Sequence, residues 1–113
     1  MDDCLFCKIV NKEIKASIVY EDDSVLAFYD LNPVAPVHIL VIPKKHISDF
    51  MSIETEDKEI IFCIHKAIKQ IINDNKIVRG FRVVVNNGKD AGQAVSHIHY
   101  HLLAGRKMQW PPG

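Results

Sequence analysis

The sequence predicts an α+β domain in which an antiparallel sheet of five strands packs with one long helix and a short N-terminal helix. Five short segments are rich in β-branched and aromatic residues, which favour strands. One longer segment repeats apolar residues at three- and four-residue steps, the spacing of an amphipathic helix. Most links are of hairpin length. With 113 residues, the chain is expected to form one domain, 1–113.

The two helices are predicted from apolar spacing and from residues that cap helix ends. Residues 2–11 show the shorter helical pattern, with Asp2 and Asp3 as candidate N-caps. The long helix is predicted from about Glu56 to Asn75, with Thr55 as its candidate N-cap.

The third of the five strands is apolar at nearly every position, which predicts a central place in the sheet. Pro43 is expected to end it, because proline cannot donate a ladder hydrogen bond. A loop containing Gly88 and Gly92 precedes the last strand. The strands are predicted at Ile18–Tyr20, Val25–Tyr29, Val37–Ile42, Phe81–Asn86 and His97–Leu103.

Composition narrows the classes of function. The net charge is zero at pH 7, so the chain lacks the basic footprint of a nucleic-acid-binding protein. No signal peptide and no apolar run of membrane-spanning length is found. Three cysteines without secretory features indicate a reducing compartment rather than a disulfide framework. We therefore expect a cytosolic protein without a membrane or nucleic-acid partner.

Half of the six histidines alternate in one stretch, at His97, His99 and His101. On a strand these rings would share one face, about 7 Å apart. Two of them could bind zinc together with a distant ligand such as His38 or His46. A neutral imidazole could instead attack phosphorus and form a covalent phospho-histidine. The third interpretation is a solvated face without a chemical role.

Residues 97–103 resemble the histidine triad signature, His-φ-His-φ-His-φ-φ, with Tyr100 in a slot that is usually apolar. Further segments resemble the nucleotide-binding branch of that family, the adenosine phosphoramidase or protein kinase C-interacting type. These segments are Phe28–Pro33, His38–Ile47, Val84–Gly88, Gly92–Gln93 and Trp110–Gly113. The resemblance implies a homodimer with one continuous sheet, binding of purine nucleoside monophosphates, and hydrolysis of the P–N bond between AMP and an amine.

The resemblance also implies roles for individual residues. His99 would be the nucleophile and His101 would lie at the α-phosphate, with His97 and His38 forming a relay behind His99. Asp30 would accept hydrogen bonds from the ribose hydroxyls. The base slot would consist of Leu5, Phe6, Ile9, Phe28 and Leu31, and the phosphate would face Asn86 and the backbone amides of Gln93, Ala94 and Val95. Ala94 replaces a serine that is frequent in the family.

Cys4 and Cys7 form a CxxC pair, which by itself is a weak signal for zinc. Its redox interpretation would require a preceding strand, and none is predicted. Resemblance to the related nucleotidylyltransferases implies a structural zinc on Cys4, Cys7, His46 and His97. The alternative is a pair of free thiols, and catalysis itself is expected to need no cofactor.

Three other functions compete with the phosphoramidate hydrolase. One is a nucleotide-sensing interaction or scaffold protein with weak or incidental activity. A second is a dinucleoside polyphosphate hydrolase, and the third is a zinc hydrolase that uses the triad as ligands. Family resemblance predicts that Trp110 reaches the partner's site across the dimer. The identity of the base and of the amine stays open.

Overall fold

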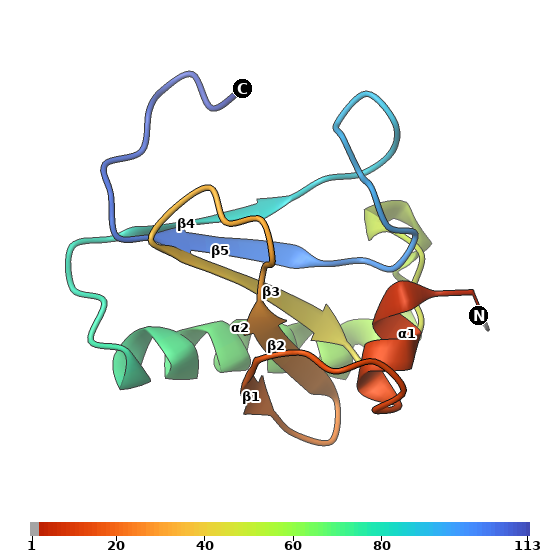
Figure 1. The fold of residues 1–113 in the computed structure, drawn as a ribbon. Coiled ribbons are helices and arrows are strands. Elements are labelled where there is room, and N and C mark those ends of the chain that lie inside the picture. The colour runs from red at the N-terminus through yellow and green to blue at the C-terminus, as the bar shows by residue number, and fades with distance from the viewer. Residues whose placement is uncertain (1–2) are drawn as a thin grey trace.

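The computed structural model describes residues 3–113, which form a five-stranded sheet flanked by two α-helices (Figure 1). The strand order is β1-β2-β3-β5-β4, and every neighbouring pair is antiparallel. The fold class and the central place of β3 are therefore confirmed. The elements are α1 (Leu5–Val10), β1 (Ile18–Glu21), β2 (Val25–Tyr29), β3 (Val37–Pro43), α2 (Lys58–Asp74), β4 (Phe81–Val85) and β5 (Tyr100–Ala104), with 3₁₀ helices at Phe50–Ser52 and Thr55–Asp57.

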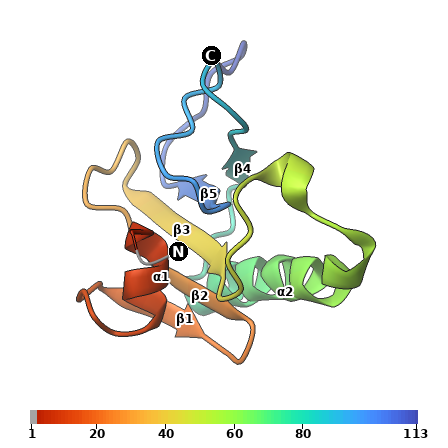
Figure 2. The same ribbon diagram turned by 90° about the vertical axis from the view of Figure 1, so that its right-hand side faces the viewer.

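The two α-helices cover opposite faces of the sheet (Figure 2). Ile39 and Val41 of β3 pack toward α2, whereas Leu40 and Ile42 pack toward α1. This division follows from the alternation of side chains along a strand. On the α1 face, Leu40 lies opposite His101 of β5. The chemistry-bearing side chains therefore face α1, and the long helix supports the sheet from behind.

The predicted helix caps are wrong at both helices. Asp3 does not cap α1, because the Sγ of Cys4 accepts the hydrogen bond from the Cys7 amide at 3.3 Å; Asp2 lies outside the described residues. Thr55 lies inside a 3₁₀ turn, and α2 begins after it at Lys58. The Asp57 carboxylate accepts from the Glu54 amide at 2.9 Å, which stabilises this extra turn.

The histidine strand is shorter than the alternation predicts. It begins at Tyr100, so His97 and His99 precede it. The amide of Ile98 donates to the carbonyl of Ile47 at 2.7 Å, which ties this segment to the chain after β3. The prediction of three imidazoles in one row is therefore wrong for His97, which the loop turns toward another set of residues.

Among residues 3–113, no helix is long and apolar enough to cross a bilayer.

Candidate active site

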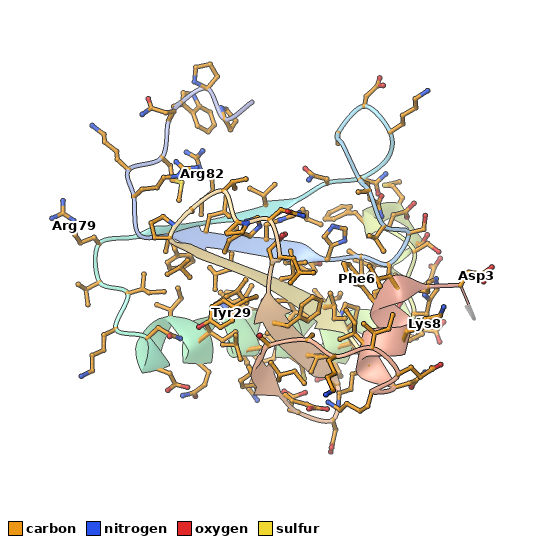
Figure 3. All side chains as sticks on the ribbon, in the orientation of Figure 1. Asp3, Phe6, Lys8, Tyr29, Arg79 and Arg82 are labelled. Atoms are coloured by element: carbon orange, nitrogen blue, oxygen red, sulfur yellow. The ribbon has the colours of Figure 1, made fainter. Side chains whose placement is uncertain are left out.

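A cavity of about 390 Å³ opens on the α1 face, within the usual range for small-molecule sites. Apolar side chains of α1, β2 and β3 form one wall, and His99 and His101 lie on another part of its lining. Figure 3 shows Phe6 projecting from α1 toward the sheet, where its ring is buried. The predicted residues that line the cavity are Leu5, Phe6, Ile9, Phe28, Asp30, Leu31, Asn86, Ala94, Val95, His99 and His101.

The cavity also contains residues that the sequence did not indicate. Leu40 could have been found, because it lies two residues beyond His38 on the same face of β3. The segment before β1 has no regular periodicity and gave no signal. The additional lining residues are Ile14, Lys15, Ala16, Ser17, Tyr29, Asn32, Leu40 and Gly92.

Gln93 is the one predicted nucleotide-binding residue that does not line the cavity. Its backbone amide donates to the carbonyl of Gly88 at 3.1 Å, and its side chain accepts from the Gly88 amide at 2.9 Å. The side-chain NH₂ donates to the carbonyls of Ser48 and Val95, at 2.8 and 3.0 Å. Gln93 therefore holds the loop in shape, and the contact of its amide with a phosphate stays a prediction.

His99 has a tautomer fixed by a backbone carbonyl. Its Nδ1 lies 2.8 Å from the carbonyl oxygen of His97, and a carbonyl can only accept. Nδ1 therefore carries the proton, and Nε2 keeps its lone pair. Because His99 also lines the cavity, its neutral ring places an unprotonated nitrogen at the cavity wall. This arrangement suits a nucleophile.

His101 receives the opposite tautomer through His38. The Val34 amide donates to Nδ1 of His38 at 3.1 Å, so neutral His38 carries its proton on Nε2. That nitrogen donates to Nδ1 of His101 at 2.9 Å, which leaves the His101 proton on Nε2. His101 can therefore donate a hydrogen bond where His99 offers a lone pair. The carboxylate of Asp30 approaches Nε2 of His38 at 3.4 Å.

This connectivity corrects the predicted relay. His38 contacts His101 and not His97, while His97 supports His99 through its backbone carbonyl. The side chain of His97 points away from His38, with its Nε2 donating to the carbonyl of Pro43 at 2.8 Å.

Burial lowers the pKa of His101, and the neighbouring His99 and His38 lower it further, whereas Asp30 raises it. The unfolded side chain binds a proton near pH 6.5. The folded one stays neutral to lower pH, so the free energy of unfolding decreases as pH falls below that value. Replacing His101 by Asn should reduce this loss, measured by urea unfolding at about pH 7.5 and 5.

The matched control is His65→Asn, because His65 is exposed on α2. This variant should show the same acid-dependent loss of stability as the parent chain. If the His101→Asn variant lost as much stability in acid as the parent chain, the lowered pKa of His101 would not be the cause of that loss.

Cys4, Cys7, His46 and His97 form a second cluster, on the far side of His97 from the cavity. Their ligand atoms all lie within 4.8 Å of one another. The Cys4 Sγ and Cys7 Sγ lie 3.3 and 3.5 Å from Nδ1 of His97, and Cys7 Sγ lies 3.2 Å from Nδ1 of His46. Tetrahedral zinc with ordinary Zn–S and Zn–N bonds requires sulfur–nitrogen separations of about 3.6 Å. The four residues therefore fit a tetrahedral Cys₂His₂ ligand set.

The surroundings of the cluster are also suited to a metal. The Pro43 carbonyl fixes the proton of His97 on Nε2, which leaves Nδ1 free to ligate. Burial lowers the pKa of His97, which favours the neutral ring that a metal requires. Burial and the neighbouring Cys4 raise the pKa of Cys7 to about 11, so an unligated Cys7 is a thiol at neutral pH. A metal would have to displace that proton.

Comparison with known proteins identifies the family. The HIT domain model matches residues 11–108. The chain is 43% identical over 113 residues to a 14 kDa zinc-binding protein of Brassica juncea, covering 98% of this chain and 100% of that protein.

Solved structures give the same result. A HIT family hydrolase from Legionella pneumophila superimposes with a TM-score of 0.95 at 46% identity, covering 98% of this chain and 100% of the other. A histidine triad protein from Clostridium difficile superimposes with a TM-score of 0.92 at 52% identity, covering 96% of both chains. The chain that places His99 and His101 beside one cavity is thus a member of the HIT, or histidine triad, family.

Proposed function

We propose that the protein is a purine nucleoside phosphoramidate hydrolase, which cleaves the P–N bond between AMP and an amine through a nucleotidyl-histidine. The observation that carries this proposal is the opposite protonation of two adjacent rings, whose centroids are 5.1 Å apart. His99 offers a lone pair on Nε2, and His101 offers a proton on Nε2. An in-line displacement at phosphorus needs both, a nucleophile and a donor.

The first chemical step forms a bond from Nε2 of His99 to the α-phosphorus and breaks the P–N bond. The leaving nitrogen takes a proton from the histidine cluster and departs as the amine. Positive charge on the nucleotidylated His99 is offset by the His97 carbonyl, which accepts from Nδ1 at 2.8 Å. His101 would stabilise negative charge on the phosphoryl oxygens. Water then attacks phosphorus and breaks its bond to Nε2 of His99, which releases AMP, restores the free ring and returns a proton to the cluster.

The cavity supports a nucleotide as the bound group. Its apolar wall, with buried Phe6 and Phe28, suits a purine ring. We propose that the Asp30 carboxylate, whose Oδ1 also accepts from the Asn32 amide at 2.7 Å, accepts from the ribose hydroxyls with its remaining lone pairs. Among residues 3–113, the amides of Ala94 and Val95 donate to no other residue, so they are available to a phosphate beside Asn86.

Zinc would have a structural role in this scheme. Bound by Cys4, Cys7, His46 and His97, it would fix α1 and the ring of His97 and would not polarise the substrate. The mechanism predicts that a chelator which strips the metal leaves P–N cleavage measurable in protein that stays folded. Complete loss of turnover with an unchanged fold would instead favour a zinc hydrolase.

We further propose that residues 1–113 act as one histidine triad domain within a homodimer. Edge strand β4 exposes Phe81 and Val83, at 47% and 41% of their surface, next to an apolar groove against α2. Trp110 is 81% exposed, as a residue that covers a partner's site would be in a single chain. A second copy would bury these surfaces.

The test of the reaction is mass spectrometry of protein quenched during turnover of adenosine 5′-phosphoramidate. We expect a single adenylyl adduct on His99. AMP binding without an adduct or amine release would favour the nucleotide-sensing interaction protein. Turnover of diadenosine polyphosphates in preference to the phosphoramidate would favour the polyphosphate hydrolase.

A further inference from the structure

Helix α1 belongs to both the Cys4 cluster and the cavity. Cys7 is a member of the cluster, whereas Phe6 and Ile9 line the cavity from the same six residues. A helix this short is unstable in water by itself, so its place depends on contacts with the rest of the protein. Any ligand that anchors one side of α1 therefore also positions its other side.

A second connection runs through His97. Its ring faces the two thiols, while its carbonyl fixes the proton of His99. The ring of Phe6 lies edge-on to both histidines, with centroids 5.9 Å from His97 and 5.1 Å from His99. The cluster and the nucleophile are thus joined by a continuous set of contacts and not by proximity alone.

We propose that a thiophilic divalent cation in the Cys4 cluster and a nucleoside monophosphate in the cavity strengthen each other's binding. Each ligand must order α1 and residues 97–99, and the one that binds second finds them already ordered. The protein would therefore hold its nucleotide in a metal-dependent manner. This inference rests on the proposed nucleotide site, but it concerns binding and does not require that the P–N bond be cleaved.

The experiment measures both affinities in both states. Zinc affinity is determined by competition with a chromophoric chelator, with and without saturating AMP. AMP affinity is determined by calorimetry on the metal-free and the zinc-loaded protein. We expect about a tenfold increase in each, and linkage requires the two factors to be equal.

Two variants separate linkage from general effects on the fold. Phe6→Leu should retain zinc binding and lower the factor toward one, because Phe6 is the ring that touches both His97 and His99. Cys63→Ser is the matched control, since Cys63 lies on α2 and packs against the core on the opposite face. In this variant each ligand should still raise the affinity for the other by about tenfold.

A spectroscopic measurement makes the test independent of these variants. The Co²⁺-loaded protein should show thiolate–cobalt absorption that changes when AMP binds, which reports geometry at the metal directly. If zinc leaves the affinity for AMP unchanged while AMP still binds and turnover is intact, the linkage alone is overturned. Absence of AMP binding to either form, together with absence of turnover, would overturn the proposed function as well.

Discussion

His99→Ala is expected to reduce phosphoramidate turnover by more than about 10⁴-fold, the scale seen when a covalent nucleophile is removed. The reason is that His99 places an unprotonated nitrogen at the cavity, with its tautomer fixed by the His97 carbonyl. AMP affinity should change little, because the base and ribose contacts belong to other residues. Single-turnover amine release and calorimetry measure the two effects separately.

The control for this variant is Lys66→Ala, which removes an exposed side chain of α2 outside the groove beside β4 and should leave turnover unchanged. Persistence of an adenylyl adduct in the His99→Ala protein would identify another nucleophile and refute the assignment. Loss of AMP binding in parallel with turnover would show that the variant damages the cavity instead.

His101→Ala is expected to lower kcat by about 10²–10³-fold, the loss typical of one donor at a developing oxyanion. Its Nε2 proton is oriented by a two-step chain, from the Val34 amide to His38 and from His38 to His101. KM should change less than kcat, because this donor is most useful when charge develops on the phosphoryl oxygens.

His38→Asn should lower kcat by a smaller factor, because His101 stays in place and loses only the hydrogen bond that fixes its proton on Nε2. Steady-state kinetics on both variants give this ranking. A larger loss of kcat in His38→Asn than in His101→Ala would contradict the proposal that His38 acts through His101. An unchanged kcat in His101→Ala would remove His101 from the proposed chemistry.

The sequence predicted the fold because periodicity reports which face of an element is buried. The isoleucine spacing of α2 and the continuous apolar runs of β2 and β3 follow from burial on the two faces of the sheet, so they could be interpreted without coordinates. Resemblance to the related nucleotidylyltransferases, not the triad signature, brought Cys4 and Cys7 together with His46 and His97, a set that the structure holds within 4.8 Å.

Contacts made by the backbone could not be predicted in this way. The ring orientations of His38, His97 and His99 are set by the Val34 amide, the Pro43 carbonyl and the His97 carbonyl. Every residue carries such groups, so no residue type marks the ones that matter. The error in the relay and the error at Thr55 share this origin, because hydrogen bonds to backbone groups decided both.

The alternation along β3 offers a practical division for redesign. Leu40 lines the cavity and His38 lies on the same face of the strand, whereas Ile39 and Val41 pack toward α2. Substitutions at Leu40, the residue of β3 that lines the cavity, would explore new substrates while leaving the α2 face of the sheet unchanged. Substitutions at Ile39 and Val41 would change thermal stability without touching the catalytic groups. Stability and substrate preference could therefore be altered separately at neighbouring positions of one strand.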